Sequence, residues 1–174
     1  MLIEKAVMSD LEAMSDFYYQ VTTYLEATIN YPGWISNVYP AKIDALNSIE
    51  NNTLYVVRDG NRIAASFILN HAAEAGYNEG NWHIEVSSDE MLVVHTLCVH
   101  PDYLRRGLAS MMVEKAIEEA KRQGVKTVRL NVYEDNEPAM RLYERYGFKE
   151  CGKADMRIGN NGPEWCILYE LVLI

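Results

Sequence analysis

The residues from His95 to Ser110 combine side chains and backbone features that bind phosphate groups. A predicted apolar strand ends at Pro101, because proline cannot donate to a sheet ladder. Arg105, Arg106 and Gly107 then precede a run with apolar residues at helical spacing. The start of such a helix offers unpaired N–H groups and a positive dipole end, and glycine lets a ligand approach the backbone. The segment therefore predicts a phosphate or pyrophosphate site.

Other patterns that bind phosphate or carry a nucleophile are absent. The sequence has no G-x-x-x-x-G-K-[ST], no G-x-G-x-x-G after an early strand and no G-x-S-x-G. A P-loop nucleotide site and a nucleophile elbow are therefore not expected. Taken alone, the segment from His95 to Ser110 could still be an ordinary strand-to-helix loop with solvated arginines.

A second segment, from Asn136 to Phe148, has the signals of a short helix. Asn136 is placed to cap it, Pro138 lies in its first turn and Gly147 closes it.

Taken together, and in this order along the chain, the two segments resemble the motifs of the GNAT superfamily of N-acetyltransferases. The family motif V-x-P-x-x-[QR]-x-x-G-x-[GA] is matched at Val99, Pro101, Gly107 and Ala109. Its second motif, N-x-x-A-x-x-x-Y-x-x-x-G-F, is matched at Asn136, Ala139, Tyr143, Gly147 and Phe148. Leu104 departs from the pattern, because it occupies the usual Gln/Arg position. We expect this to alter a detail of binding, since the family holds pyrophosphate largely through backbone N–H groups.

The resemblance implies acetyl-CoA as co-substrate, held where the sheet splays between its fourth and fifth strands. Its pantetheine would pair with main-chain groups of the strand segment Leu97, Cys98 and Val99. Its pyrophosphate would be surrounded by Arg105, Arg106, Gly107, Leu108, Ala109 and Ser110, and the rest of the CoA arm would meet Asn136, Ala139 and Tyr143. The side chains of Cys98 and His100 are interpreted as structural.

Acetyl transfer to an amine requires a base for the amine and an acid for the leaving thiolate. The resemblance places the tyrosine of the second motif at the CoA sulfur, which makes Tyr143 the candidate acid. His95 is the candidate base, because an ordinary imidazole, with a pKa of about 6.5, is neutral in the cytoplasm. A half-buried structural histidine remains the alternative at this position. Glu85, Glu90 and a water chain are other candidate bases.

The sequence motifs identify fewer residues for binding the acceptor than for binding acetyl-CoA. The aromatic residues Tyr24, Tyr31, Trp34 and Tyr39 are candidates to line an acceptor pocket, with Tyr31 and Trp34 as the predicted acceptor-binding residues, because an amine cation favours aromatic faces. They could equally form a packed loop core. Related ribosomal-protein N-terminal acetyltransferases carry a glutamate base on the fifth strand, where this chain has Asn131. Asparagine cannot act as a general base, so Asn131 is expected to orient substrate or CoA instead.

Composition restricts the class of protein. The 174 residues, 49% hydrophobic and 24% charged, predict a single soluble domain over 1–174. A net charge of −9 argues against nucleic acid as the main partner and is compatible with a cationic acceptor. Three cysteines without C-x-x-C spacing and scattered histidines predict reduced thiols in a cytoplasmic protein and no metal site. No signal peptide, membrane span or membrane partner is expected, and a homodimer is left open.

The order of predicted elements is β-α-α-β-β-β-α-β-α-β-β. Helices are predicted from Ser9, with a Ser9–Glu12 capping box, to about Leu25, and over 41–49, 107–123 and 136–146. Strands are predicted over 1–7, 54–57, 63–69, 91–99, 126–132, 148–158 and 164–173, with turns at Asp59-Gly60 and Asn160-Asn161-Gly162 and a long polar loop over 70–90. This order predicts an α+β (mixed α/β) GNAT fold, a central mixed, splayed sheet flanked by helices.

We therefore predict an acetyl-CoA-dependent N-acetyltransferase that acts on a primary amine of a small molecule by direct transfer in a ternary complex. A protein N-terminus or lysine as acceptor, and an acyl-CoA-binding sensor without turnover, are the alternatives.

Overall fold

The computed structural model describes residues 1–157 and 164–174 of the chain. They form two compact units, one of Met1–Leu69 with His95–Lys115 and the other of Asn70–Val94 with Ala116–Ile174. The single domain expected from the sequence stays a prediction.

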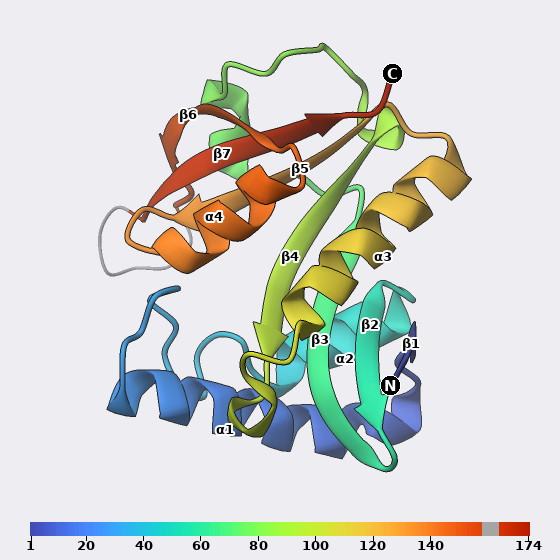
Figure 1. Cartoon of the computed structure of the whole chain (residues 1–174), viewed down its shortest axis with the longest axis vertical. Helices are drawn as coiled ribbons and strands as arrows, with labels where there is room; N and C mark the ends of the chain where they lie inside the picture. The colour runs from blue at the N-terminus through green and yellow to red at the C-terminus, as the bar shows by residue number, and fades with distance from the viewer. Residues whose placement is uncertain (158–163) are drawn as a thin grey trace. The chain divides into compact units, whose positions relative to one another are not determined.

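The strands form one mixed sheet in the order β1-β2-β3-β4-β5-β7-β6 (Figure 1). They are β1 Leu2–Lys5, β2 Leu54–Asp59, β3 Arg62–Asn70, β4 Met91–Val99, β5 Thr127–Tyr133, β6 Lys149–Asp155 and β7 Trp165–Val172. The helices are α1 Leu11–Ala27, α2 Lys42–Glu50, α3 Leu108–Gln123 and α4 Glu137–Arg145. The predicted fold class and order of elements are confirmed, with boundaries that shift by a few residues. The predicted turn at Asn160-Asn161-Gly162 lies outside the described residues.

In the first unit, α1 and α2 pack on the antiparallel strands β1, β2 and β3. The helices contribute apolar side chains at helical spacing, and the strands contribute the buried side chains that face them. The predicted hairpin turn is confirmed, with Gly60 at a φ of +59°. The buried residues of this core are Ala6, Met14, Phe17, Tyr18, Val21, Ala45, Ile49, Leu54, Val56, Ile63, Ile68 and Cys98.

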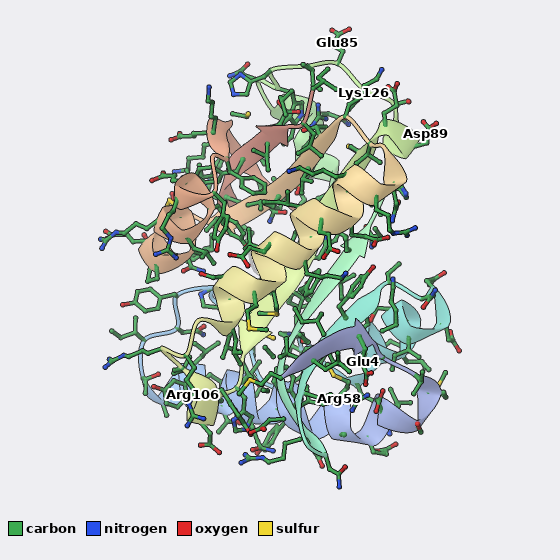
Figure 2. The ribbon with its side chains drawn as sticks, turned by 45° about the vertical axis from the view of Figure 1, so that its right-hand side comes forward. Glu4, Arg58, Glu85, Asp89, Arg106 and Lys126 are labelled. Carbon is green, nitrogen blue, oxygen red and sulfur yellow. The ribbon has the colours of Figure 1, made fainter. Side chains whose placement is uncertain are left out.

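The start of α1 differs from the prediction. Instead of a Ser9–Glu12 capping box, the carboxylate of Asp10 accepts a hydrogen bond from the Val7 N–H at 2.8 Å. The same Oδ2 atom accepts from Arg58 Nη2 at 2.7 Å, and Arg58 also pairs with Glu4 across β1 and β2 (Figure 2). The predicted capping box is wrong. The ion pair with Arg58 on β2 fixes the Asp10 carboxylate where it accepts from the Val7 N–H, so Asp10 and not Ser9 bonds the backbone before the helix.

In the second unit, β4 and β5 are parallel, and β7 pairs antiparallel with both β5 and β6. The β4–β5 ladder joins Met91–Val93 to Thr127–Arg129, at the start of both strands. The segment 70–90, predicted as a polar loop, contains two short 3-10 turns, Ala75–Glu79 and Ser88–Glu90. Its Tyr77, Trp82 and Val86 pack on the core of Met91, Val93, Cys151, Ala154, Met156, Cys166 and Leu168.

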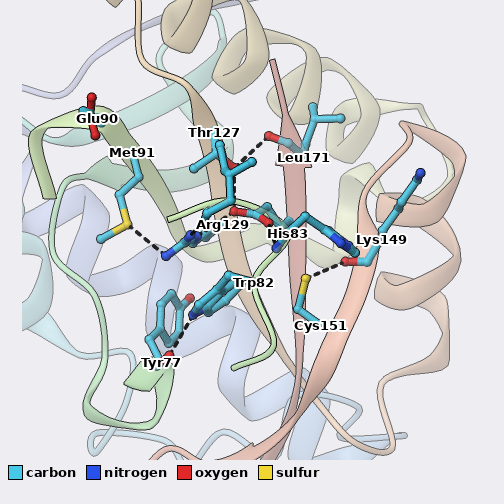
Figure 3. A network of polar contacts seen from close by, with 12 residues as sticks. Tyr77, Trp82, His83, Glu90, Met91, Thr127, Arg129, Lys149, Cys151 and Leu171 are labelled. Carbon is cyan, nitrogen blue, oxygen red and sulfur yellow. Dashed lines mark hydrogen bonds and ion pairs between the residues drawn. The ribbon is translucent and has the colours of Figure 1, made fainter. Parts of the chain in front are cut away.

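A buried ion pair fastens this segment to the sheet (Figure 3). Arg129 on β5 and Glu170 on β7 are register partners, and Arg129 Nε lies 2.9 Å from Glu170 Oε1. Arg129 Nη2 donates to the Ile84 carbonyl at 2.7 Å, and its guanidinium carbon lies 4.2 Å from the centre of the Trp82 ring. Glu170 Oε2 accepts from the His83 N–H at 2.7 Å. Both members of the ion pair therefore hold backbone or ring groups of residues 82–84.

Among the described residues, no helix is both long enough and apolar enough to cross a membrane.

Candidate functional site

The loop between β4 and α3 is anchored on the β2–β3 hairpin. Tyr103 Oη donates to Asp59 Oδ2 at 2.9 Å, and Arg62 Nη2 lies 2.7 Å from Asp102 Oδ2. Where β4 ends, the N–H of His100 donates to the Ala64 carbonyl at 2.9 Å. These contacts fix the place at which the chain turns into α3, and thus the position of the predicted phosphate cradle.

The turn into α3 exposes backbone and guanidinium groups together. Arg105 and Gly107 have φ values of +62° and +79°, and a Cβ built on Gly107 would meet no atom within 4 Å. Both arginines are exposed, and Figure 2 shows Arg106 at the surface. The guanidinium carbon of Arg106 lies 5.0 Å from the centre of the Tyr103 ring. Because the first N–H groups of a helix lack intrahelical partners, this arrangement fits the pyrophosphate of a coenzyme.

The second half of β4 alternates between half-buried and buried side chains. His95, Leu97 and Val99 are half-buried, whereas Thr96 and Cys98 are buried. The Cys98 thiol lies 3.5 Å from Ser66 Oγ, and burial raises its pKa to about 12. The Cys98 side chain therefore packs inside as a neutral thiol.

His100 follows the strand and is buried against α1. Its Nε2 lies 2.9 Å from Gln20 Oε1, and its Nδ1 accepts from the Asp102 N–H at 3.1 Å. Burial lowers the pKa of His100, so its neutral form is favoured. Both ring nitrogens are engaged in holding the loop, which suits a structural role.

Helix α4 carries the residues of the second motif. The Asn136 side chain caps it by accepting from the Ala139 N–H at 3.3 Å, and Gly147 follows its end with a φ of +87°. Tyr143 is buried, and its ring meets the edge of Phe148 at 5.6 Å between centroids. Burial raises the pKa of the Tyr143 phenol above its ordinary value of 10.0. The phenol therefore holds its proton throughout the neutral pH range.

Asn131 on β5 has two partners in the same unit. Its Oδ1 accepts from Tyr77 Oη at 2.9 Å, and its Nδ2 lies 3.6 Å from Cys166 Sγ. Burial is the main cause of a strongly raised pKa at Tyr77, and the nearby Glu74, Cys166 and Tyr143 raise it further. Sequence reasoning did not assign Tyr77 to the site. In the sequence, the nearby glycines Gly76 and Gly80 are the local signal. The structure explains Gly76, because a Cβ at this position would lie 2.7 Å from the Asp155 carbonyl oxygen.

The aromatic candidates for the acceptor lie in the first unit. Trp34 is half-buried and packs on the core, and its N–H and carbonyl are both bonded by the Asn30 side chain, at 3.1 and 2.7 Å. Tyr31 is exposed. The structure thus places Tyr31 and Trp34 in the unit of His95, and Asn131 in the unit of Tyr143.

The alternative bases differ in their surroundings. Glu90 pairs with Lys126 and accepts from the Ser87 N–H at 3.1 Å, and these contacts, Lys126 first, lower the pKa of its carboxyl. Glu85 is exposed and points outward from its loop (Figure 2). A lowered pKa makes Glu90 a weaker base.

One group of side chains has the donor types of a metal site. A ring nitrogen of His83, the thiol of Cys151 and a carboxylate oxygen of Glu170 lie within 4.8 Å of one another. The Glu170 carboxylate, however, already accepts hydrogen bonds from Arg129, Thr127 and the His83 N–H. Burial raises the pKa of the Cys151 thiol to about 11, which disfavours the thiolate that would bind a metal. These contacts account for the cluster as a fastening of the 70–90 segment.

The chain matches the model of the acetyltransferase (GNAT) family over residues 16–148. Over 70 residues it is 37% identical to an uncharacterised N-acetyltransferase of Methanocaldococcus jannaschii, covering 40% of this chain and 31% of that protein. Over 54 residues it is 44% identical to the [ribosomal protein bS18]-alanine N-acetyltransferase of Salmonella typhimurium, covering 31% and 36%. The chain thus matches about a third of the length of these curated relatives.

Solved structures share the fold over nearly the whole chain. An acetyltransferase of the GNAT family from Streptococcus agalactiae has a TM-score of 0.82 at 19% identity, covering 99% of this chain and 95% of that one. The protein yncA of Salmonella typhimurium, solved with its cofactor acetyl-CoA, has a TM-score of 0.71 at 17% identity, covering 100% and 94%.

Proposed function

The chain belongs to the GNAT acetyltransferase family, and on this premise we propose that it transfers the acetyl group of acetyl-CoA to a primary amine. The transfer is direct, within a complex that holds both substrates. The observation that carries the proposal is the buried Tyr143 on the Asn136-capped helix α4, whose phenol keeps its proton at neutral pH.

The residues fit the coenzyme at two places. The N–H groups and guanidiniums of Arg105–Ser110 receive the pyrophosphate, supported by the positive φ of Arg105 and Gly107 and by the space over Gly107. Main-chain groups of Leu97–Val99 receive the pantetheine, supported by a β4–β5 ladder that ends at Val93. Asn136 and Ala139 on the first turn of α4 contact the CoA arm. When bound, acetyl-CoA supplies an activated acetyl thioester.

Two side chains move the protons. His95, directly or through water, takes a proton from the acceptor ammonium, and the free amine attacks the thioester carbonyl to form the C–N bond. As the C–S bond breaks, the Tyr143 hydroxyl gives its proton to the departing thiolate and is reprotonated by the second N–H proton that the new amide nitrogen loses. The phenol of Tyr143 is protonated at neutral pH, and the burial that disfavours its own ionisation also makes a thiolate formed beside it more basic, so the proton can pass to the leaving sulfur. The ion pair of Glu90 with Lys126 supports His95 over that carboxylate as the base.

The acceptor is a small molecule with a primary amine, held by Tyr31, Trp34 and Asn131. The aromatic rings of Tyr31 and Trp34 suit an amine cation, and the net charge of −9 favours a cationic substrate over an anionic one.

A protein N-terminus is the second candidate acceptor, and the similarity to the bS18-alanine enzyme favours it. An α-amine, with a pKa of about 8, also needs less help from a base than an alkyl amine, with a pKa of about 10.4. This matters because the β5 position holds Asn131, which is bonded to Tyr77 and carries no carboxylate.

Release of free thiol from acetyl-CoA tests both candidates. The acceptors are alkyl and aralkyl amines, free amino acids, a peptide with N-terminal alanine, and a lysine peptide with a blocked N-terminus. Thiol release with the free amines supports the small-molecule acceptor, and preference for the alanine peptide over free alanine supports a protein N-terminus. Binding of acetyl-CoA without thiol release from any acceptor would contradict the proposed transfer and favour a sensor.

A further inference from the structure

The backbone of β4 is strained at one residue. Thr96 has a φ of +49°, and it is the only β-branched residue among the non-glycine residues described with positive φ, the others being Asn37, Asn52, Arg105 and Arg157. Such a conformation is a genuine outlier for a β-branched side chain and persists only when its surroundings hold it. Thr96 lies between His95, the proposed base, and Leu97, a proposed pantetheine contact.

The side chain of Thr96 is in contact with Tyr39. The hydroxyls of Tyr39 and Thr96 are hydrogen-bonded to each other across 57 positions of sequence. Thr96 is buried and Tyr39 is half-buried. Tyr18, which interacts electrostatically with Tyr39, is fully buried, and this burial is the main cause of its raised pKa. A hydrogen bond in such a dry setting is stronger than one in water.

Tyr39 is itself rigidly placed. Its N–H donates to the Ile35 carbonyl at 3.0 Å, and its carbonyl accepts from the Ile35 N–H at 3.3 Å. Its ring meets Trp34 edge-on, with 6.1 Å between centroids. The Tyr39 hydroxyl therefore connects the segment with the aromatic acceptor residues to the strand that carries His95.

We propose that Tyr39 is a positioning residue, whose hydroxyl holds Thr96 in its left-handed conformation and thereby orients His95 and Leu97. A reversed φ at one residue changes the direction of the chain on both sides of it. The half-buried and buried alternation of β4 begins at His95, directly before this residue. The roles of His95 and Leu97 in this inference rest on the proposed function.

A double-mutant cycle tests the inference, because glycine adopts a positive φ without a side chain to hold. Tyr39→Phe is expected to lower kcat about tenfold in the wild-type background and less than twofold in the Thr96→Gly background. Thr96→Ser keeps the hydroxyl and is expected to keep the full dependence on Tyr39. Tyr19→Phe, at an exposed tyrosine of α1, is the matched control and is expected to leave kcat unchanged.

Two results would overturn the inference. Equal losses from Tyr39→Phe in both backgrounds would show that Tyr39 acts elsewhere, for example on acceptor KM. A Tyr39→Phe variant with a lower Tm and an unchanged kcat would show that the Tyr39 hydroxyl contributes to stability and not to the position of His95.

A second readout does not depend on turnover. The backbone coupling constants and chemical shifts of Thr96, measured by NMR, report the sign of φ; we expect a positive φ in the wild type and a negative one in Tyr39→Phe. An unchanged φ at Thr96 in Tyr39→Phe would overturn the role of Tyr39 even if the enzyme is active. If the wild type releases no thiol while φ responds as expected, the proposed function fails and the structural role of Tyr39 stands.

Discussion

The two compact units support their site residues by different physical means. In the first, the second half of β4, from His95 to Val99, and the loop before α3 rest on an apolar core formed by α1, α2, β2 and β3. In the second, the interior includes an ion pair, Arg129–Glu170, whose side chains are only 8% and 0% exposed. An apolar core loses stability gradually as methylenes are removed, whereas a buried ion pair fails when either partner loses its charge. We expect the second unit to be more sensitive to single polar substitutions.

The largest effect is expected in the first unit, at His95. His95→Ala should lower kcat/KM by about 10²–10⁴-fold, because the acceptor amine loses its base. The limb of the pH–rate profile that reports this base should disappear, and added imidazole should restore part of the rate. His71→Ala, at an exposed histidine of the second unit, serves as the control. Survival of that limb in His95→Ala would assign the base to another group.

The next effect sharpens the contrast between the units directly. Glu170→Gln should lower the free energy of unfolding by about 3–5 kcal/mol, because it leaves the Arg129 charge buried without its partner. Replacing both residues by apolar ones should cost less than this single change. Glu137→Gln breaks an exposed pair with Arg141 on α4 and should have no measurable effect in denaturant titrations. A loss at Glu170 as small as that at Glu137 would remove the distinction between the two units.

In the second unit, Tyr143→Phe should lower kcat by about 10–10³-fold with little change in acetyl-CoA affinity. Burial disfavours the phenolate, so the wild-type minus variant difference in tyrosinate absorbance should appear only above pH 10. Tyr146→Phe, on the turn that ends α4, is the control. Unchanged turnover in Tyr143→Phe would exclude this residue as the acid.

The smallest effect concerns the thiols of the two units. Burial raises the pKa to about 12 at Cys98 in the first unit and to about 11 at Cys151 and Cys166 in the second. None should react with a disulfide reagent at pH 8 in the folded protein, and all three should react after denaturation. Unfolded thiols ionise near pH 8.5, so stability should fall as pH rises from that value towards 11. Rapid labelling of Cys151 and Cys166 alone would show that the second unit opens by itself.

Local chemistry made much of the fold predictable. Helix α4 lies between Asn136 and Gly147 because a capping side chain and a glycine act on their own neighbours in sequence. Likewise, Pro101 ends β4 and Gly107 precedes α3, so the cradle could be placed without knowledge of the rest of the chain. The start of α1 was predicted wrongly because Arg58, 48 positions away, pairs with Asp10.

By itself, the sequence determined the order of elements and the two motifs of the GNAT family, since both depend on residues close together in the chain. Only the tertiary structure revealed the contacts that position the proposed site. Tyr39 meets Thr96 across 57 positions, Tyr77 meets Asn131 across 54, and Arg129 meets Glu170 across 41. Such pairs leave no periodicity or spacing in the sequence, because each forms only when the packing of the sheet brings distant strands and loops together.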